Sequence, residues 1–282
     1  MQGKVVVVTG ATSGIGQVAA ETLARMGARI VQVARDAGRG EAAFARLREI
    51  APSVSHKVHH ADLSRLAEMK RVAAEIADAE PRIDVLINNA GAVFGARQVT
   101  EDGLERTFAL NHMSYFVLTA LLRERLVTAA PARIVNTASG RHRKGRLDFA
   151  DLQGEKRFQG FRAYANSKLC NVLFTRALAR RLAGKGVTAN CLHPGFVATR
   201  FGDQAGGLHA IGIRLAKLGA ITPEQGAQTL VYLASSPEVA ATTGGYFGKS
   251  RLETASPGGQ DDAAAEQLWA ESERIAGISF RS

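Results

Sequence analysis

The chain has 282 residues, of which 46% are hydrophobic, and its 36 Lys and Arg against 26 Asp and Glu give a formal net charge of +10 at pH 7. This apolar share can bury a sizeable core and excludes a wholly disordered chain. Two cysteines cannot form a disulfide framework, and no paired spacing of metal ligands is present, so we expect no metal site. No apolar run reaches the roughly 18 residues of a membrane-spanning helix, and no membrane span is expected.

The positive charge leaves two interpretations open. Either it attracts an anionic partner, such as a phosphorylated ligand, or it belongs to a solvated basic surface. No basic run is interleaved with aromatic residues, so nucleic acid is not expected as a partner. Residues 1–4 lead directly into a strand-like run without a secretion signal. Together with the low cysteine content, this predicts a cytoplasmic location.

Strand-like and helical patterns alternate along the chain. The first strand contains Val5-Val6-Val7-Val8, an unbroken β-branched run typical of a strand buried on both faces. A glycine-rich turn and a helical pattern over 15–26 come next. The remaining predicted elements are strands over 29–34, 54–60, 83–88, 134–137, 187–192 and 244–248, and helices over 36–50, 64–77, 104–126 and 161–182. We expect Ser64 to cap the helix over 64–77.

This alternation predicts βαβ units and therefore an α/β fold, a single Rossmann-type doubly wound parallel sheet of about seven strands with helices on both faces. No composition shift or linker interrupts the pattern, so we expect one domain over 1–282. Two stretches depart from the alternation. Residues 140–160 are basic and loop-like, and residues 196–220 are punctuated by glycines.

The turn after the first strand reads Thr-Gly-Ala-Thr-Ser-Gly-Ile-Gly over residues 9–16. Its glycines permit a tight turn, and the helix N-terminus that follows offers N–H groups and a positive dipole end to a pyrophosphate. Because the motif lies between a strand and a helix, it predicts a dinucleotide site, and a purely structural turn is the alternative. The predicted pyrophosphate contacts are Gly10, Thr12, Ser13, Gly14, Ile15 and Gly16.

The end of the second strand is expected to select the cofactor. NAD-specific sites place a carboxylate there for the ribose 2′-hydroxyl. Here Ala34 and Arg35 occupy that place, and a guanidinium can pair with a 2′-phosphate. Asp36 comes later in the chain and can instead cap the next helix. The pattern therefore predicts NADP (NADPH) as the cofactor, with NAD as the weaker alternative.

Two further strand ends complete the predicted cofactor site. Asp62, with Leu63 beside it, follows the third strand and can accept a hydrogen bond from the adenine amino group. The fourth strand ends in Asn89, Ala90 and Gly91, whose small side chains let the backbone pass close to a ligand. Ligands of open α/β sheets bind at this carboxyl edge.

Tyr164 and Lys168 are spaced i, i+4 on a predicted helix and therefore share one face. A free phenol has a pKa near 10, so a tyrosine that acts as a base at pH 7 needs its pKa lowered by roughly 3 units. An ammonium group at about 4 Å can supply that shift. Ser139, after the fifth strand, can hydrogen-bond the reacting oxygen, and Asn111, on the long helix, can anchor a water in a proton relay.

Together these motifs resemble the short-chain dehydrogenase/reductase family over nearly the whole chain. The implied function is hydride transfer between NADP(H) and a small-molecule alcohol or carbonyl substrate, with a tyrosine as acid/base and a lysine that binds the nicotinamide ribose. The catalytic tetrad implied by the resemblance consists of Asn111, Ser139, Tyr164 and Lys168. The residues that it places against the nicotinamide include Pro194, Gly195, Val197 and Thr199.

A closer resemblance is to the branch of retinol dehydrogenases and WW-domain oxidoreductases. It rests on the pair Asn111-His112, the long gap from Ser139 to Tyr164, and the stretches 151–157, 164–174, 226–229 and 245–247. This sequence shows neither the membrane-anchoring N-terminal segment of the animal enzymes nor a WW module. Ala138 stands where a serine is usual. Retinoid activity therefore does not follow from the resemblance.

Other functions stay open. A dinucleotide-binding fold could serve as a non-catalytic redox sensor, which would not need Tyr164 and Lys168 together, or as a lyase or epimerase with a bound nicotinamide. The segment around 196–220 is either a lid over an apolar substrate or ordinary core, because it carries an apolar stripe, Leu208, Ile211, Leu215 and Leu218.

The remaining expectations concern the surface and the packed residues. The basic run 141–146 is either solvated or guides NADP or an acidic substrate. The two long helices predict a homodimer or homotetramer, because such helices pack between subunits in the resembled family. We expect His112, Cys170 and Trp269 to be packing residues.

Overall fold

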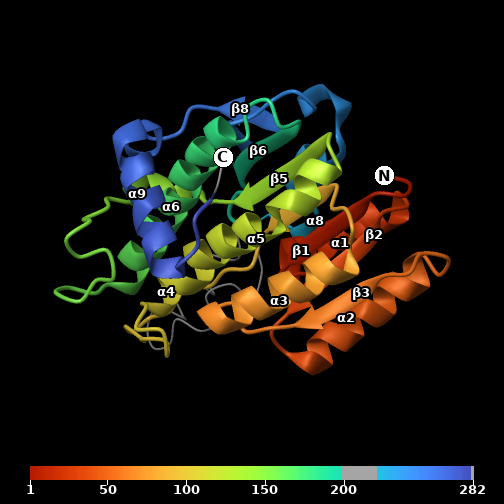
Figure 1. The fold of residues 1–282 in the computed structure, drawn as a ribbon, viewed down its shortest axis with the longest axis horizontal. Coiled ribbons are helices and arrows are strands. Elements are labelled where there is room, and N and C mark those ends of the chain that lie inside the picture. Colours follow the sequence, from red (N-terminus) through yellow and green to blue (C-terminus); the bar gives the residue numbers. More distant parts are fainter. Residues whose placement is uncertain (198–220, 281–282) are drawn as a thin grey trace.

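The computed structural model describes residues 1–197 and 221–280 of the chain. Strands and helices alternate through these residues, as the sequence pattern predicts (Figure 1). The strands are β1 (Val5–Thr9), β2 (Arg29–Ala34), β3 (Lys57–His60), β4 (Val85–Asn88), β5 (Ala132–Thr137), β6 (Val187–His193), β7 (Tyr246–Gly248) and β8 (Arg251–Glu253). The α-helices are α1 (Gly14–Arg25), α2 (Ala37–Ile50), α3 (Leu66–Ala79), α4 (Arg106–Phe108), α5 (Ser114–Thr128), α6 (Gly160–Arg181), α8 (Pro223–Ser235) and α9 (Asp262–Ala276).

All of these strands belong to one sheet, in the order β3-β2-β1-β4-β5-β6-β7-β8. Neighbouring strands are parallel except β7 and β8, which pair antiparallel. From β1 the chain first adds β2 and β3 on one side of the sheet and then returns to add β4 and the later strands on the other side, so the strand order switches direction between β1 and β4. Ligands of open α/β sheets bind at the carboxyl ends of the strands beside such a switch point. The predicted α/β fold with a doubly wound sheet is therefore confirmed.

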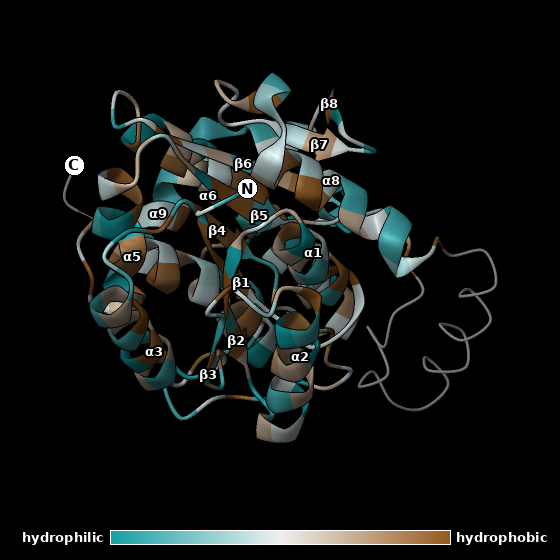
Figure 2. Cartoon of the chain, turned by 90° about the vertical axis from the view of Figure 1, so that its right-hand side faces the viewer, coloured by the Kyte–Doolittle hydropathy of each residue, from teal (hydrophilic) through white to brown (hydrophobic). Residues whose placement is uncertain are grey.

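Helices cover both faces of the sheet (Figure 2). The apolar side chains of α1, α2 and α8 form one buried cluster with the sheet, and those of α3, α5, α6 and α9 form another. The valine run of β1 explains how one strand serves both layers. Val6 and Val8 belong to the first cluster and Val5 and Val7 to the second, because successive side chains of a strand point to opposite faces.

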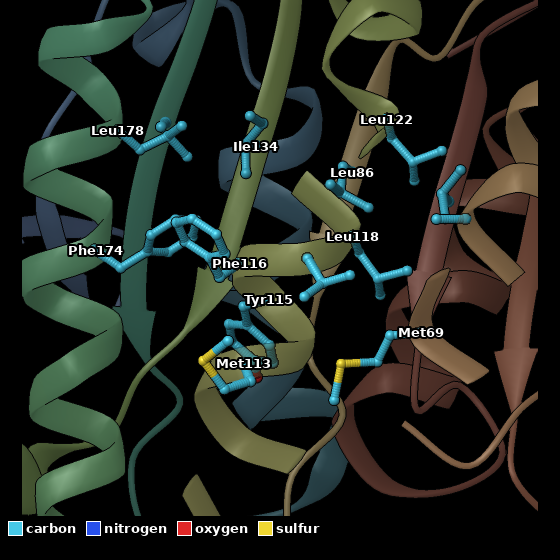
Figure 3. Close-up of a cluster of buried hydrophobic side chains, with 14 of the residues drawn as sticks. Met69, Leu86, Met113, Tyr115, Phe116, Leu118, Leu122, Ile134, Phe174 and Leu178 are labelled. Carbon is cyan, nitrogen blue, oxygen red and sulfur yellow. The ribbon is translucent and has the colours of Figure 1, made fainter. Parts of the chain in front are cut away.

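Aromatic side chains tie α5, α6 and α9 together in the larger cluster. Phe116 of α5 packs against Phe174 of α6 and Trp269 of α9, with ring centroids 5.9 and 5.2 Å apart. In Figure 3, Phe116 and Phe174 face each other between α5 and α6, and Tyr115 lies beside Phe116. Trp269 is buried, as predicted. Dense packing of this kind holds α5 and α6 against the sheet. Of the predicted catalytic residues, Tyr164 and Lys168 lie on α6, and Asn111 lies in the helical turn just before α5.

The sheet has one strand more than the seven expected. The extra strand, β8, has three residues and lies at the edge, and its polar, largely exposed sequence Arg-Leu-Glu shows no strand pattern. β3 is shorter than predicted, because the His56 N–H bonds the Val54 carbonyl in a turn. The cap of α3 was also predicted wrongly. Arg65 is its N-cap, and Ser64 instead donates to the Asp62 carboxylate at 2.8 Å.

The long helix predicted over 104–126 is interrupted. It starts as α4, passes through a π-helical turn (Ala109–Met113), and continues as α5. The stretch 140–160 begins with a 3₁₀ turn, Gly140–Lys144. Apart from its first two residues, the predicted lid over 196–220 lies outside the described residues, together with its apolar stripe. Within the described ranges, no helix has both the length and the hydropathy needed to cross a bilayer.

Candidate active site

The glycine-rich turn brings the end of β1 against the end of β4. Gly10 has a φ of +69°, and a Cβ built there would lie 2.9 Å from the Ala90 Cα. A Cβ on Gly16 would lie 2.3 Å from the Asn89 Nδ2. Both positions therefore require glycine, one for its conformation and its close approach and the other for its close approach. Packing against the residues after β4 therefore requires these glycines, whether or not a ligand is bound.

The N-terminus of α1 follows this turn and fits an anionic ligand. Its N-cap, Ser13, makes no side-chain capping bond, and its first turn contains no acidic residue. The first N–H groups of a helix have no partner within the helix, and the helix dipole adds a partial positive charge. The turn 9–16 is therefore chemically suited to a dinucleotide pyrophosphate.

Arg35 and Asp36 follow β2 and have different environments. The Asp36 carboxylate caps α2, because it accepts from the Arg39 N–H at 2.8 Å, and the Arg39 Nε lies 3.5 Å away. That backbone hydrogen bond is the main cause that holds the pKa of Asp36 below its usual value. Arg35 is exposed and makes no ion pair with any residue that the structure describes. Of the two, the guanidinium is thus the group available to an anion.

A threonine and an asparagine lock the ends of β1, β4 and β5. The Thr9 Oγ1 accepts from the backbone N–H groups of Asn89 and Ala90, at 2.9 and 3.0 Å. The Asn89 side chain donates to the carbonyls of Thr9 and Gly10 and accepts from the Thr137 hydroxyl at 3.3 Å. Asn89 was predicted as a cofactor contact, and in the structure its side chain joins three strand ends.

Asp62 and Leu63 follow β3 at the same edge. One carboxylate oxygen of Asp62 accepts from both the N–H and the hydroxyl of Ser64, at 3.0 and 2.8 Å. Asp62 is half-buried, and its other carboxylate oxygen makes no such bond among the described residues. Leu63 is buried. The side chain that was predicted to face adenine is thus held in a fixed orientation.

Asn111 lies in the π-helical turn and is fully buried. Its amide accepts from the Ala92 N–H and donates to the Ala92 carbonyl, both at 2.9 Å, and it also donates to the Ser167 hydroxyl at 3.0 Å. A Cβ placed on Gly91 would lie 3.2 Å from the Asn111 Oδ1 and 3.4 Å from the Lys168 Nζ. Asn111 therefore holds the loop after β4 beside the Lys168 ammonium.

The carbonyl of Thr137, the last residue of β5, accepts hydrogen bonds from three buried side chains. The Lys168 Nζ donates to it at 2.9 Å, and Asn171 Nδ2 and Tyr115 Oη donate to it at 3.3 and 3.4 Å. Lys168 is 2% exposed, and burial lowers its pKa to about 7. The sequence analysis did not identify this carbonyl, Tyr115 or Asn171. Of the three, only Asn171 lies in a stretch on which the family resemblance rests, residues 164–174.

Tyr164 lies near both Ser139 and Lys168. Burial raises the pKa of Tyr164 to about 12, and a hydrogen bond from Ser139 and the charge of Arg141 oppose that shift. The Lys168 Nζ lies 5.9 Å from the Tyr164 ring centroid and is not among the causes of the shift. The pKa of Tyr164 in this structure is therefore raised, whereas a value lowered by Lys168 was expected. Burial of Lys168 disfavours its own charged ammonium form.

Ser139 is oriented by the turn that follows it. It is the N-cap of the 3₁₀ turn, and its hydroxyl oxygen accepts from the Arg141 N–H at 3.2 Å. A hydroxyl that accepts from the backbone has its proton left to donate. That proton is directed to the Tyr164 oxygen, in agreement with the bond that lowers the Tyr164 pKa.

The segment after β6 lies against the first turn of α1. Gly195 has a φ of +87°, and Val197 forms an isolated bridge with Ile221. A Cβ on Gly226 of α8 would meet Val197 Cγ2 at 2.6 Å and Ile15 Cγ2 at 2.9 Å. Two predicted cofactor residues, Ile15 and Val197, are therefore close neighbours, and Pro194 begins the same segment. Thr199 lies outside the described residues.

The residues expected to have packing roles are buried. His112 is fully buried, its Nε2 lies 2.9 Å from the Ser272 hydroxyl of α9, and burial lowers its pKa to about 3. Cys170 is a buried free thiol whose pKa burial raises.

Comparisons with known proteins show the family to which the chain belongs. The model of the short chain dehydrogenase family matches residues 4–207. Human retinol dehydrogenase 13 is 41% identical over 289 aligned residues, which cover 99% of this chain and 86% of that protein. A solved structure of an uncharacterized protein from Mycobacterium paratuberculosis is 33% identical and superposes with a TM-score of 0.81, covering 100% of this chain and 96% of that one.

A further solved structure, the RhlG/NADP active-site complex of Pseudomonas aeruginosa, is 29% identical with a TM-score of 0.70, over 88% of this chain and 94% of that one. The family match covers more than half of the chain, and the retinol dehydrogenase match covers nearly all of it. These matches show that the chain belongs to the short-chain dehydrogenase family, in its retinol dehydrogenase-like branch, and that it is an NAD(P)-dependent oxidoreductase of alcohols and carbonyl compounds.

Proposed function

We propose that the protein is an NADP(H)-dependent dehydrogenase/reductase in which Tyr164 is the acid/base and Asn111, Ser139 and Lys168 complete the tetrad. The observation that carries this proposal is the convergence at the end of β5. Three groups from two separate parts of the chain meet there, because Ser139, after β5, bonds Tyr164 of α6, and Lys168 of α6 bonds the Thr137 carbonyl. A redox sensor would have no use for this convergence.

We assign a separate chemical role to each of three tetrad residues. Ser139 has a fixed donor hydroxyl that can hold a substrate carbonyl oxygen against Tyr164. Tyr164 has a raised pKa and is a neutral phenol at pH 7, the form that gives a proton to the forming alkoxide. Lys168, with a pKa of about 7, can take up or release a proton near neutrality. When bound, the nicotinamide cofactor gives or accepts the hydride.

Arg35 supports NADP over NAD. It stands at the end of β2, exposed and without an ion pair in the described residues, while Asp36 is engaged in capping α2. A guanidinium with no competing carboxylate can pair bidentately with a 2′-phosphate. The similar structure from Pseudomonas aeruginosa is an NADP complex, which is consistent with this choice.

Two exposed aromatic side chains support an apolar substrate. Phe161 lies three residues before Tyr164 on α6 and is 38% exposed, and Phe196 follows Gly195 and is 53% exposed. Burial of these rings by a ligand would be favourable, since apolar surface removed from water stabilises a complex by about 25 cal/mol per Å². The similar proteins named retinol dehydrogenases make an isoprenoid alcohol one compound to test.

The test is NADPH oxidation, followed at 340 nm, with aliphatic, aromatic, steroid and isoprenoid carbonyls, and the reverse reaction with their alcohols. We expect turnover of at least one apolar class. NADPH binding with no turnover of any carbonyl or alcohol would favour the redox-sensor alternative. The single domain over 1–282, the homodimer or homotetramer and the cytoplasmic location stay predictions, which limited proteolysis, light scattering at micromolar concentration and cell fractionation can test.

A further inference from the structure

His142 lies three residues after Ser139, in the 3₁₀ turn, and is fully buried. Its Nδ1 lies 2.7 Å from the Ser139 carbonyl oxygen. Its Nε2 accepts from the Ser256 N–H at 3.1 Å. The imidazole therefore joins the backbone of a predicted catalytic residue to a segment more than a hundred residues later in the chain. None of the roles considered above uses this histidine.

The two partners determine the tautomer of His142. A backbone N–H can only donate and a backbone carbonyl can only accept, so Nε2 must be unprotonated and Nδ1 must carry the proton. The ring is neutral in this arrangement. Burial is the main cause that lowers the pKa of His142, which keeps the ring neutral at physiological pH. Tyr246 packs against it with ring centroids 4.7 Å apart, which restricts rotation of the ring.

The segment that receives His142 is itself held firmly. We call residues 254–260 the buttress segment. The Arg143 side chain donates to the Thr254 carbonyl at 2.7 Å, and the Ser256 hydroxyl caps the 3₁₀ turn Pro257–Gln260. A Cβ on Gly259 would meet Val172 Cγ1 of α6 at 3.1 Å. The buttress segment therefore packs on the helix that carries Tyr164 and Lys168, although it lies beyond residues 4–207 that the family model matches.

On the other side, the 3₁₀ turn is pressed against α6. A Cβ on Gly145, the residue that ends the turn, would lie 2.8 Å from the Ala165 carbonyl and 2.9 Å from the Leu169 Cβ. The turn is thus in contact with α6, and the His142 imidazole joins it to the buttress segment. A shift of this turn would move the Ser139 hydroxyl relative to Tyr164.

We propose that His142 is a positioning residue for Ser139. In its neutral Nδ1–H form it ties the Ser139 carbonyl to the buttress segment, and so fixes the hydroxyl that orients the substrate carbonyl. This inference rests on the oxidoreductase function proposed above and adds a structural part to it, in which residues outside the matched family region determine the geometry of the catalytic serine.

Two substitutions separate the two bonds of the imidazole. In His142→Asn the amide can occupy the place of Nδ1 and keep the donation to Ser139, whereas in His142→Gln it can occupy the place of Nε2 and keep only the bond from Ser256. We expect His142→Gln to lower the rate of hydride transfer by about 10- to 100-fold, the cost of a small misplacement of a reacting group. We expect His142→Asn to retain most of the rate. KM and NADPH affinity should change by less than about threefold in both variants, because these bonds orient only Ser139.

A double-mutant cycle tests whether His142 acts through Ser139. The rate of a single turnover is measured in Ser139→Ala with and without His142→Gln. If His142 only positions the serine, the second substitution has no further effect on the rate once the hydroxyl is gone. His56→Gln is the matched control, because His56 is also buried and accepts from a backbone N–H, that of Ile30 at 3.0 Å, near the start of β2. It should lower the melting temperature and leave the rate unchanged.

Equal rates in His142→Asn and His142→Gln, or a full additive loss in the Ser139→Ala background, would overturn the proposal. A readout without turnover separates it from the proposed function. In ¹⁵N-histidine-labelled protein at pH 8, the His142 resonances, assigned by their loss in His142→Asn, should show the neutral Nδ1–H tautomer. An Nε2–H tautomer would contradict the positioning role even if the enzyme is active. Absence of turnover with the expected tautomer would instead count against the proposed function alone.

Discussion

The two halves of the carboxyl edge of the sheet are built differently. The nucleotide half, at the ends of β1, β2 and β3, offers backbone N–H groups of α1 and the exposed side chain of Arg35. The other half, at the ends of β4, β5 and β6, is the proposed catalytic half. It consists of buried side chains that bond one another and the backbone, of which Asn111 and Lys168 are 0% and 2% exposed. Recognition of an anion needs donors that are available, whereas proton transfer needs groups whose positions and pKa values are fixed in advance.

The largest effect should come from the acid/base of the catalytic half. Tyr164→Phe keeps the ring and removes the proton donor, so kcat for carbonyl reduction should fall by about 10²- to 10⁴-fold. NADPH affinity, measured by fluorescence titration, should stay within about threefold. Tyr232→Phe is the matched control, since the Tyr232 hydroxyl, on α8, donates to the exposed Glu238 carboxylate at 2.9 Å. Near-normal activity in Tyr164→Phe would place the acid/base elsewhere.

The next prediction concerns the stability cost of the buried lysine. The pKa of Lys168 is about 7 in the folded protein and about 10.4 in an unfolded chain, so the unfolded state binds more protons between these values. Its contribution to stability is therefore least favourable below pH 7 and improves as the pH rises toward 10. Lys168→Met should abolish turnover yet raise the free energy of unfolding by a few kcal/mol at pH 7, at about 1.4 kcal/mol per pKa unit.

Denaturant unfolding at pH 7 and pH 10 checks this prediction. The gain in Lys168→Met should shrink at pH 10, where Lys168 is neutral in the folded protein and near the midpoint of its titration in the unfolded chain. Lys185→Met replaces an exposed lysine at the end of α6 and should change neither stability nor its pH dependence appreciably. A Lys168→Met protein that is less stable than the parent at pH 7 would show that its bond to Thr137 outweighs the desolvation of the ammonium.

In the nucleotide half, a single exposed charge should control cofactor choice. Arg35→Gln removes one charge-assisted phosphate contact, worth about 1.5–3 kcal/mol, so NADPH should bind roughly 10- to 150-fold more weakly. NADH affinity should be almost unchanged. Arg48→Gln, at the far end of α2, serves as the control. Equal affinity of the parent protein for NADPH and NADH would refute the assignment of Arg35 to the 2′-phosphate.

The smallest effect concerns the apolar substrate. Along a series of straight-chain aldehydes, each buried CH₂ should improve kcat/KM by up to about 0.8 kcal/mol, or roughly fourfold, until the binding site is full. Phe161→Ala should flatten this dependence, whereas Met26→Ala, at the C-terminal end of α1, exposes a similar side chain elsewhere and should not. A constant or falling kcat/KM with chain length in the parent protein would indicate a small polar carbonyl instead.

Local patterns were enough to predict strands β1 to β7 and the helices between β1 and β6, whereas α8 and α9 were not predicted. Local patterns also gave the residues proposed for the nucleotide half. Some features act through their immediate neighbours, so their expected roles can be inferred from adjacent residues. These features are the valine run of β1, the glycines of residues 9–16 and the position of Arg35. Asp36 capping α2 was predicted for the same reason. β8 was missed because three largely exposed residues that pair only at the sheet edge carry no apolar periodicity.

For the catalytic half, the sequence predicted the four residues Asn111, Ser139, Tyr164 and Lys168 but not the hydrogen bonds that hold them. By itself, the sequence determined which strands and helices form and which side chains stand at their ends, because propensity and periodicity act over a few residues. Only the tertiary structure decided that Tyr115, Lys168 and Asn171 meet at the Thr137 carbonyl, and that His142 reaches the buttress segment. It also decided the directions of the Tyr164 and Lys168 pKa shifts. The reason is physical: a pKa depends on how completely distant segments exclude water from a group, and no spacing along the chain reports that exclusion.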